Sequence, residues 1–375
     1  MSTSSPRQAK HGTAMPAPSL WLLLGDKAGD NGQVLALARA LGWPYEMKAL
    51  RFNERYRESN ARLGASLASL DPAASSPLAA PWPDLVIGVG RRSVPIARWI
   101  RAQSGGRSRL VQLGRPRLDL RELDLVITTP QYALPPSHNV LQLSAPLNRI
   151  APEALDQAAA AWRERLAGMP APFIAVMVGG AAGRYAFDAD AASALAAAVE
   201  GLRRETGGSL LVTTSRRTPD EFADRLFAGI SDPACRHRWN ASGGSPYAAF
   251  LALAERIVVT GDSASMLAEA TALGKPVHLF DPPSLAARWS QRIWDRWDPA
   301  GSDAASSRPL HRILDFAVRR GILRPSRSMA ALHRGLLAEG KLHRLGESAP
   351  MKQPHGQGDP EMDRAVARIH ALFDR

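Results

Sequence analysis

The sequence predicts an α/β fold of two lobes in tandem, followed by C-terminal helices. Short apolar runs of strand length alternate with helical patterns from residue 20 to residue 143, as is typical of a parallel sheet covered by helices on both faces. The same alternation restarts at residue 173 and continues to residue 280. Between the two halves, a helical stretch ends in the segment 168–172, whose glycine and prolines predict an interdomain linker.

In the first half, short apolar runs bounded by turn residues predict the strands. These are Leu20–Gly25, Tyr45–Leu50, Asp84–Val89, Arg109–Leu113, Asp124–Thr128 and Val140–Leu143. Apolar residues at helical spacing predict helices at Gly32–Leu41 and Val94–Gln103. The segment Asp71–Pro83, rich in Pro, Ala and Ser, is expected to be a loop.

The second half repeats this pattern and is followed by a helical region. Its predicted strands are Phe173–Val178, Ser209–Thr213, Arg236–Trp239, Arg256–Thr260 and Val277–Phe280. Its predicted helices are Ala189–Glu205, Pro219–Phe227, Pro246–Ala254 and Ser263–Leu273. Helices are also predicted at Pro152–Ala167 before the linker and, near the C-terminus, at Leu310–Gly321, Ser328–Glu339 and Glu361–Phe373.

These elements divide the chain into five parts. Residues 1–18 are rich in Ser, Pro, Ala and Gly and are expected to be a disordered tail. The first lobe is predicted at 19–150, the interdomain helix and linker at 151–172, the second lobe at 173–282 and the C-terminal helical region at 283–375.

Composition limits the class of protein. A chain of 375 residues with 45% hydrophobic residues can bury the cores of two domains. The single cysteine, Cys235, excludes a disulfide framework and fits a reducing compartment. The longest apolar run near the start, Leu20–Leu24, is too short to span a membrane and lacks the layout of a signal peptide. We therefore expect a cytoplasmic protein.

The charge is strongly basic, with a formal excess of +12. Such a surface suits nucleic acid, an anionic membrane or phosphorylated substrates, or it is simply a solvated surface. Aromatic residues are few and no nucleic-acid module is recognisable, so nucleic acid is not expected as a partner. Peripheral contact with the inner face of a membrane is the expectation drawn from one arginine-rich segment. Its arginines are Arg91, Arg92, Arg98, Arg101, Arg107, Arg109, Arg115, Arg117 and Arg121.

The segment 256–281 is the strongest candidate for a binding site. It reads as a buried strand, a turn at Gly261-Asp262, a helix beginning near Ser263 and a second strand. A helix that begins with Ser263 and Ser265 offers free N–H groups and small hydroxyls to a phosphate. Glu269 follows one and a half turns later, within reach of a ribose. The spacing suits a nucleoside diphosphate.

Two small-residue loops follow the first strand of each half, and they are expected to face a common cleft. One spans 25–33 and the other spans 179–185, beginning with Gly179 and Gly180. The glycines of these loops would let the backbone approach an anion closely. The alternative interpretation of each loop is a tight turn from strand to helix that requires glycine. In the first loop, Asp26 and Asp30 are candidates to accept a proton from a sugar hydroxyl, with Lys27 keeping them ionised. The alternative for Asp30 is capping of the helix from Gly32.

A third loop, 213–218, follows the second strand of the second half. Ser215 and Arg216 in this loop provide a hydroxyl and a guanidinium for a diphosphate, together with the neighbouring Arg217. Asp188 and Asp190 match the Asp-x-Asp motif with which some sugar-nucleotide enzymes hold a metal ion. Their place directly before an alanine-rich helix favours helix capping instead. The histidines show no metal-ligand spacing, so no metal site is predicted.

Several motifs together resemble the mitochondrial-fission family, also called the elongated-mitochondria family, which includes bacterial proteins regarded as glycosyltransferases. The resemblance covers residues 19–335 approximately. It is carried by Gly25–Gln33 with Leu41-Gly42-Trp43, by Asp84–Arg91, Thr128–Tyr132 and Gly179-Gly180, by Thr260–Ser263 with Glu269, by Gly274–Val277 and by Leu310–Arg312.

This family is similar to GT-B glycosyltransferases, whose two Rossmann-like lobes hold the nucleotide sugar on the second lobe and the acceptor on the first. The resemblance implies a nucleoside-diphosphate sugar as donor substrate, a lipid-linked or cell-envelope acceptor and no other cofactor. It implies donor contact for Gly179, Gly180, Ser215, Ser263, Ser265, Met266 and Glu269, with Glu269 on the ribose.

Three interpretations stay open at this point. Without a metal cluster, a transferase would stabilise the departing diphosphate with positive side chains and helix N-termini. The same scaffold would also serve a sugar-nucleotide epimerase, since fold does not determine chemistry. A non-catalytic adaptor recruited to a membrane is the third interpretation. One departure from the family stands at Asn148, where several relatives are expected to carry histidine.

Overall fold

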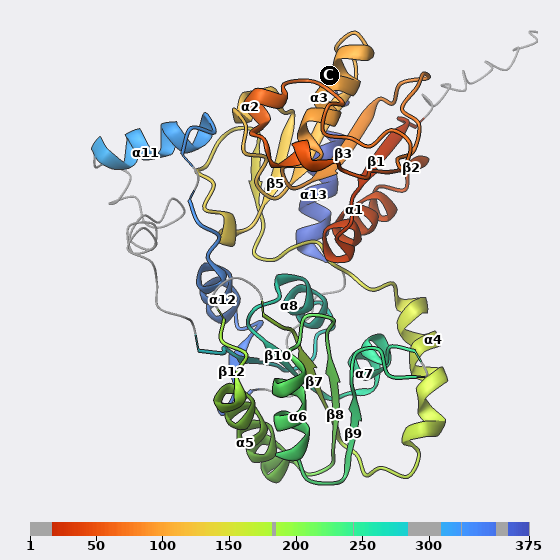
Figure 1. Cartoon of the computed structure of the whole chain (residues 1–375), viewed down its shortest axis with the longest axis vertical. Coiled ribbons are helices and arrows are strands. Elements are labelled where there is room, and N and C mark those ends of the chain that lie inside the picture. The colour runs from red at the N-terminus through yellow and green to blue at the C-terminus, as the bar shows by residue number, and fades with distance from the viewer. Residues whose placement is uncertain are drawn as a thin grey trace, which may run out of the picture.

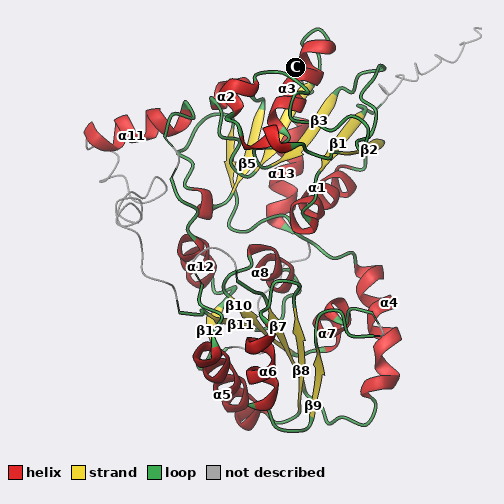
Figure 2. Ribbon diagram, viewed as in Figure 1, coloured by secondary structure: helices red, strands yellow, loops and turns green. Residues whose placement is uncertain are grey.

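The computed structural model describes residues 17–181, 185–242, 244–283, 309–323, 325–349 and 359–374. It shows two α/β lobes, each built around a six-stranded sheet whose strands all run parallel (Figures 1 and 2). The predicted fold class, two Rossmann-like lobes in tandem with C-terminal helices, is therefore confirmed.

The first lobe has the strand order β2-β1-β3-β4-β5-β6. The strands are β1 (Leu20–Leu24), β2 (Tyr45–Ala49), β3 (Leu85–Val89), β4 (Arg109–Leu113), β5 (Leu125–Thr128) and β6 (Val140–Gln142). The helices are α1 (Ala28–Leu41), the short α2 (Asn60–Leu63) and α3 (Val94–Gln103). Strands such as β1 are apolar on both faces because helices cover both sides of a parallel sheet.

One face of the first sheet is covered by α1 and by the C-terminal helix α13 (Pro360–His370). Ala365 and Ile369 of α13 are fully buried with Leu37 of α1. Trp43, just after α1, packs edge-on against Phe373. The end of the chain therefore crosses back from the second lobe to complete the first.

The second lobe has the strand order β12-β11-β10-β7-β8-β9. Its strands are β7 (Phe173–Val178), β8 (Ser209–Thr214), β9 (Ala234–His237), β10 (Arg256–Thr260), β11 (Val277–Phe280) and β12 (His343–Arg344). Its helices are α5 (Ala189–Thr206), α6 (Asp220–Ala228), α7 (Tyr247–Leu253) and α8 (Ala264–Thr271). The helices α5 and α6 bury one face of the sheet, and α7 and α8 bury the other.

The segments that flank the second lobe are divided between the lobes. The linker helix α4 (Pro152–Arg163) packs on the second lobe, where the Trp162 ring lies 5.4 Å from Phe250. Of the C-terminal helices, α12 (Met329–Ala338) buries Leu336 in the core of the second lobe, whereas α11 (Pro309–Arg319) buries Val318 in that of the first. The C-terminal helical region is thus not a separate packing unit.

Each sheet contains a topological switch point, where ligands bind in open α/β sheets. In the first sheet β1 lies between β2 and β3, so successive connections diverge beside the carboxyl ends of β1 and β3. In the second sheet the same divergence occurs between β7 and β10. The loops singled out from the sequence follow β1, β7 and β10, so the topology places them at these two points.

Most predicted elements are found, but several boundaries differ, and the short elements α2 and β12 were not predicted. Helix α1 begins at Ala28, four residues earlier than predicted. The Asn31 amide accepts from the Gly25 N–H at 3.0 Å and donates to the Gly25 carbonyl at 2.8 Å, which closes the turn early. Strand β9 begins two residues earlier than predicted. The proposed tail 1–18 falls almost wholly outside the described residues, as does segment 284–308 of the C-terminal region.

A buried histidine on β11 makes stability depend on pH. His278 is 1% exposed, and burial, with the charges of Arg256 and His343, lowers its pKa from 6.5 to about 4. The imidazole of His278 binds a proton more tightly in the unfolded chain than in the folded protein. Burial of neutral His278 therefore contributes its full stability above pH 6.5, and this stability is lost as the pH falls toward 4. The loss amounts to about 3 kcal/mol of unfolding free energy.

We therefore expect His278→Leu to reduce the destabilisation measured between pH 7 and pH 4 by about 3 kcal/mol in denaturant titrations. His138→Leu, at an exposed position, is the control. An acid destabilisation of the same size in His278→Leu and in the unmodified chain would contradict the assignment.

Candidate functional site

The second-lobe switch point is organised by a buried carboxylate, Asp262. The Thr260 hydroxyl donates to Asp262 Oδ1 at 2.7 Å, and the Gly180 N–H donates to Asp262 Oδ2 at 3.0 Å. Arg217 Nη2 lies 3.6 Å from the same carboxylate. Burial raises the pKa of Asp262, while the two hydrogen bonds and Arg217 oppose that rise. The sequence pattern places Asp262 only in a turn before the helix. The tertiary contacts show that its carboxylate joins the ends of β7 and β10.

Packing around this carboxylate explains the two glycines after β7. A Cβ on Gly179 would lie 2.2 Å from Asp262 Oδ1, and a Cβ on Gly180 would lie 2.1 Å from the Arg217 carbonyl. Their N–H groups donate to Thr260 and Asp262. Both N–H groups therefore have partners within the protein, and donor contact by Gly179 and Gly180 stays a prediction. They shape the site by allowing close approach of protein atoms.

The loop after β8 is a hydrogen-bonded turn. The Ser215 N–H donates to the Thr218 hydroxyl at 2.9 Å, and the Thr218 hydroxyl donates to the Gly179 carbonyl. This anchors the loop beside the β7 end. Arg217 and Arg216 are both exposed, and Arg217 lies near Asp262. The predicted grip of these two arginines on a diphosphate stays a prediction.

Helix α8 begins at the same point. Ser263 is its N-cap, and its hydroxyl accepts from the Met266 N–H at 3.5 Å, as the sequence predicted for a helix beginning near Ser263. N–H groups in the first turn of a helix have no partner within the helix, so this turn can bind an anion. Ser265 and Met266 in this turn are only partly buried.

Glu269 lies on α8 next to an aromatic hydroxyl that sequence reasoning missed. The Tyr247 hydroxyl donates to Glu269 Oε2 at 2.6 Å. Burial raises the pKa of Glu269, opposed by the Tyr247 hydrogen bond and by the positive charge of Arg149. The carboxylate is thus held in one orientation, with one of its oxygens occupied by Tyr247. Arg149 comes from the segment that joins the two lobes.

The two lobes touch at the starts of α1 and α8. A Cβ on Gly29 would lie 2.4 Å from Ser265 Oγ, so these residues are in contact across the lobe boundary. Asn148 Nδ2 donates to the Gly29 carbonyl at 2.7 Å and holds the start of α1 in place. In this chain Asn148 is a buried anchor of the α1 start. Figure 1 shows α1 and α8 on the facing sides of the lobes.

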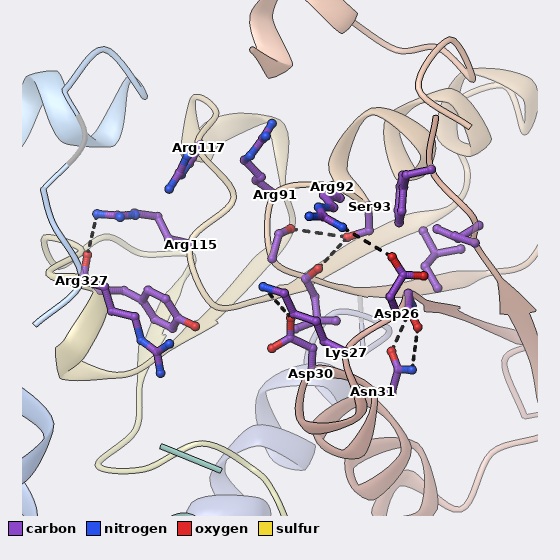
Figure 3. A pocket seen from close by; sticks show the side chains of 17 residues that line it. Asp26, Lys27, Asp30, Asn31, Arg91, Arg92, Ser93, Arg115, Arg117 and Arg327 are labelled. Atoms are coloured by element: carbon purple, nitrogen blue, oxygen red, sulfur yellow. Dashed lines mark hydrogen bonds and ion pairs between the residues drawn. The ribbon is translucent and has the colours of Figure 1, made fainter. Parts of the chain in front are cut away.

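A pocket of about 310 Å³ lies at the switch point of the first lobe (Figure 3). Its charged lining combines cations with the two candidate bases. The cations are Lys27, Arg91, Arg92, Arg115, Arg117 and Arg327, and the carboxylates are Asp26 and Asp30. Asn31, Ser93 and Tyr132 add polar groups. We call this the first-lobe pocket.

The two carboxylates in the first-lobe pocket have different partners. Asp26 lies 3.0 Å from Arg51 and 3.6 Å from Arg92. Its cationic partners are therefore these two arginines, whereas the sequence predicted Lys27. Asp30 lies 4.0 Å from the exposed Lys27 and sits in the first turn of α1. The alternative of Asp30 as N-cap is wrong, because Lys27 occupies that position.

The arginines of the arginine-rich segment have different surroundings. Four of its arginines line the first-lobe pocket, namely Arg91, Arg92, Arg115 and Arg117. Four others form ion pairs with carboxylates: Arg98 with Glu122, Arg101 and Arg109 with Asp124, and Arg121 with Asp119. The expected membrane-facing patch is thus divided between a pocket and local ion pairs.

Other candidate groups have structural explanations. Asp188 caps α5 by accepting from the Ala191 N–H at 2.9 Å, as predicted. Cys235 is partly buried, and burial raises the pKa of its thiol. In the described parts of the chain, no three His, Cys, Asp or Glu side chains are grouped to hold a metal ion. No helix in those parts is sufficiently long and apolar to span a bilayer.

Fold and site together define a two-lobed protein of the Rossmann-like, GT-B type, with one polar strand-end site on each lobe. The chain belongs to the mitochondrial fission ELM1 family, whose model matches residues 28–295. The mitochondrial fission protein ELM1 of Arabidopsis thaliana is 30% identical over 219 residues, which cover 52% of this chain and 51% of that protein. The match thus spans about half the length of this relative.

The chain is also similar to solved structures at low sequence identity. The UDP-GlcNAc 2-epimerase from Methanocaldococcus jannaschii is 10% identical, with a TM-score of 0.47 over 94% of this chain and 99% of that chain. A glycosyltransferase from Rickettsia africae ESF-5 is 10% identical, with a TM-score of 0.44 over 96% of this chain and 99% of that chain. The assignment of chemistry therefore rests on the residues of this chain.

Proposed function

We propose that this protein is a glycosyltransferase that uses a nucleoside-diphosphate sugar as donor. The observation that carries the proposal is the contact between Gly29 and Ser265. It joins the loop with the candidate bases to the helix start suited to a diphosphate. A donor bound at α8 would therefore present its sugar to the first lobe.

The donor would lie along α8. Ser263, Ser265 and Met266 would face the diphosphate at the positive end of the helix dipole. Glu269, oriented by Tyr247, would accept hydrogen bonds from the ribose through its remaining oxygen. Ser215 would hold the neighbouring turn, and Arg216 and Arg217 would supply positive charge.

The reaction would transfer the sugar to a hydroxyl group bound on the first lobe. The acceptor oxygen forms a bond to the anomeric carbon while the bond from that carbon to the diphosphate breaks, and the electron pair leaves with the diphosphate. Asp30 takes the proton of the acceptor hydroxyl. Asp26 acts as a positioning residue, since it already pairs with Arg51 and Arg92. Arginines and helix N-termini of this chain would stabilise the departing charge.

The acceptor in this proposal is a lipid-linked or cell-envelope molecule, as the family resemblance implied. What supports an acceptor on the first lobe is the position of the pocket beside Asp30. We keep the predicted lobes at 19–150 and 173–282, with α11 and α13 of the C-terminal region serving the first lobe and α12 serving the second.

Calorimetric titration with a panel of nucleoside diphosphates and sugar nucleotides tests the proposal. We expect one of them to bind, and Glu269→Gln to weaken that binding at least about tenfold, through the loss of a charge-assisted hydrogen bond. Glu205→Gln on the exposed side of the same lobe is the matched control. The bound compound should then be consumed with transfer of its sugar.

Acid should weaken the same binding. The ribose contact requires ionised Glu269, whose pKa is raised by burial, so affinity should fall as the pH drops through that raised value. In Glu269→Gln this dependence should disappear. Binding of no nucleotide would favour the adaptor interpretation, and isomerised sugar nucleotide without transfer would favour the epimerase.

A further inference from the structure

We infer that the first-lobe pocket binds the phosphate or diphosphate group of a phosphorylated acceptor. The inference rests on the proposed function and names the acceptor's chemical class. The phosphate is the recognition group, and a hydroxyl on the same molecule is the nucleophile that reaches Asp30. A lipid-linked phosphate and a water-soluble sugar phosphate share this chemistry.

Basic side chains outnumber acidic ones in the lining of the first-lobe pocket. Six basic side chains and two acidic ones give a formal excess of four positive charges in about 310 Å³. Five of the six cations are arginines, which match the oxygens of phosphate in bidentate fashion. A neutral sugar acceptor would not require this excess, whereas a phosphate ester carrying up to about two negative charges would use it.

Buried polar side chains hold the arginine-bearing loops in fixed positions. Gln112, buried in β4, donates to the Gly90 carbonyl at 2.6 Å and fixes the turn that leads to Arg91 and Arg92. Asn60, buried in α2, donates to the Arg91 carbonyl at 3.0 Å and to the Pro116 carbonyl at 2.7 Å. A single amide therefore ties together the two loops that supply most of the arginines.

Arg117 adds an unusual backbone conformation to this arrangement. Its φ angle is +56°, in the left-handed region that non-glycine residues rarely adopt. Such strain persists where the surrounding structure imposes it, and it clusters at functional sites. The exposed Arg117 lines the pocket and directly follows Pro116, whose carbonyl Asn60 anchors (Figure 3).

Arg327 links the pocket to the second lobe. The segment that carries it is tied to the first lobe, because the Ser328 N–H donates to the Gln131 carbonyl at 2.9 Å and Arg115 donates to the Pro325 carbonyl. Helix α12 follows directly, and its His333 Nε2 lies 2.8 Å from the Gly261 carbonyl. One segment thus connects the pocket with the loop that begins α8. The phosphate site thus combines first-lobe residues with Arg327 of the C-terminal region.

Isothermal titration with inorganic pyrophosphate tests the inference on the full chain. We expect binding that weakens at least about tenfold in Arg117→Gln and in Arg327→Gln, two exposed positions where the fold should be retained. Arg117→Lys should keep part of the affinity because it keeps the charge but not the bidentate geometry. Arg121→Gln, on the same lobe and outside the pocket, is the matched control.

A second-lobe variant separates this site from the donor site. Arg217→Gln should leave pyrophosphate binding to the first-lobe pocket intact, and the pocket variants should leave nucleotide binding intact. Glucose 6-phosphate and farnesyl phosphate then distinguish a water-soluble from a lipid-linked source, and binding of either one supports the inference. Pyrophosphate binding lost only in Arg217→Gln, or unchanged in both pocket variants, overturns it. Neither result would affect the nucleotide test at Glu269.

Discussion

Asp30→Asn is expected to lower the rate of sugar transfer by about 100-fold or more, the usual contribution of a general base. Asparagine has the same shape and keeps the residue at the first turn of α1, but it cannot accept the proton of the acceptor hydroxyl. The measurement is kcat/KM with the donor identified by the nucleotide panel. Nucleotide affinity should not change, because the proposed donor contacts lie on the second lobe.

Two comparisons make the Asp30 result specific. Asp156→Asn, exposed on the linker helix, should retain full activity. Asp26→Asn should reduce activity by about tenfold, mainly through KM, because it releases Arg51 and Arg92 from their shared partner. If Asp30→Asn transferred sugar at the unmodified rate, Asp30 would not be the base and the proposed geometry would be wrong.

Gly180→Ala is expected to destabilise the fold by about 3 kcal/mol, at the upper end for overpacking of a core. The new Cβ would lie 2.1 Å from the carbonyl carbon and oxygen of Arg217 and 2.5 Å from the Thr218 nitrogen. These are backbone atoms of a hydrogen-bonded turn, so no side-chain rotation relieves the overlap. The turn would have to move away from the β7 end, and with it Arg217.

Denaturant titration measures this effect as a shift of the unfolding midpoint. Gly168→Ala in the exposed linker is the matched control, because a Cβ there meets nothing within 4 Å. An unchanged midpoint for Gly180→Ala would show that the turn moves freely. The two backbone segments would then not define the shape of the site.

Local sequence patterns were sufficient for most elements. Apolar runs such as Leu85–Val89 are buried on both faces of a parallel sheet, so their composition alone distinguishes them from half-exposed strands. Ser263 and Asp188 identified two helix starts, because capping is a contact between near neighbours in the chain. The start of α1 was missed because the Asn31 side chain, instead of an N-cap, closes that turn.

The candidate site depended more on contacts between distant segments. The sequence by itself determined that polar loops follow β1, β7 and β10, because strand ends and turn residues are local features. Only the tertiary structure decided that Asp262 accepts from Gly180, that Arg217 rather than Arg216 faces it, and that Gly29 meets Ser265. It also gathered Arg327 with four arginines of one earlier segment into a single pocket. Such pairings depend on strand order and on packing between lobes, and neither leaves a local pattern in the sequence.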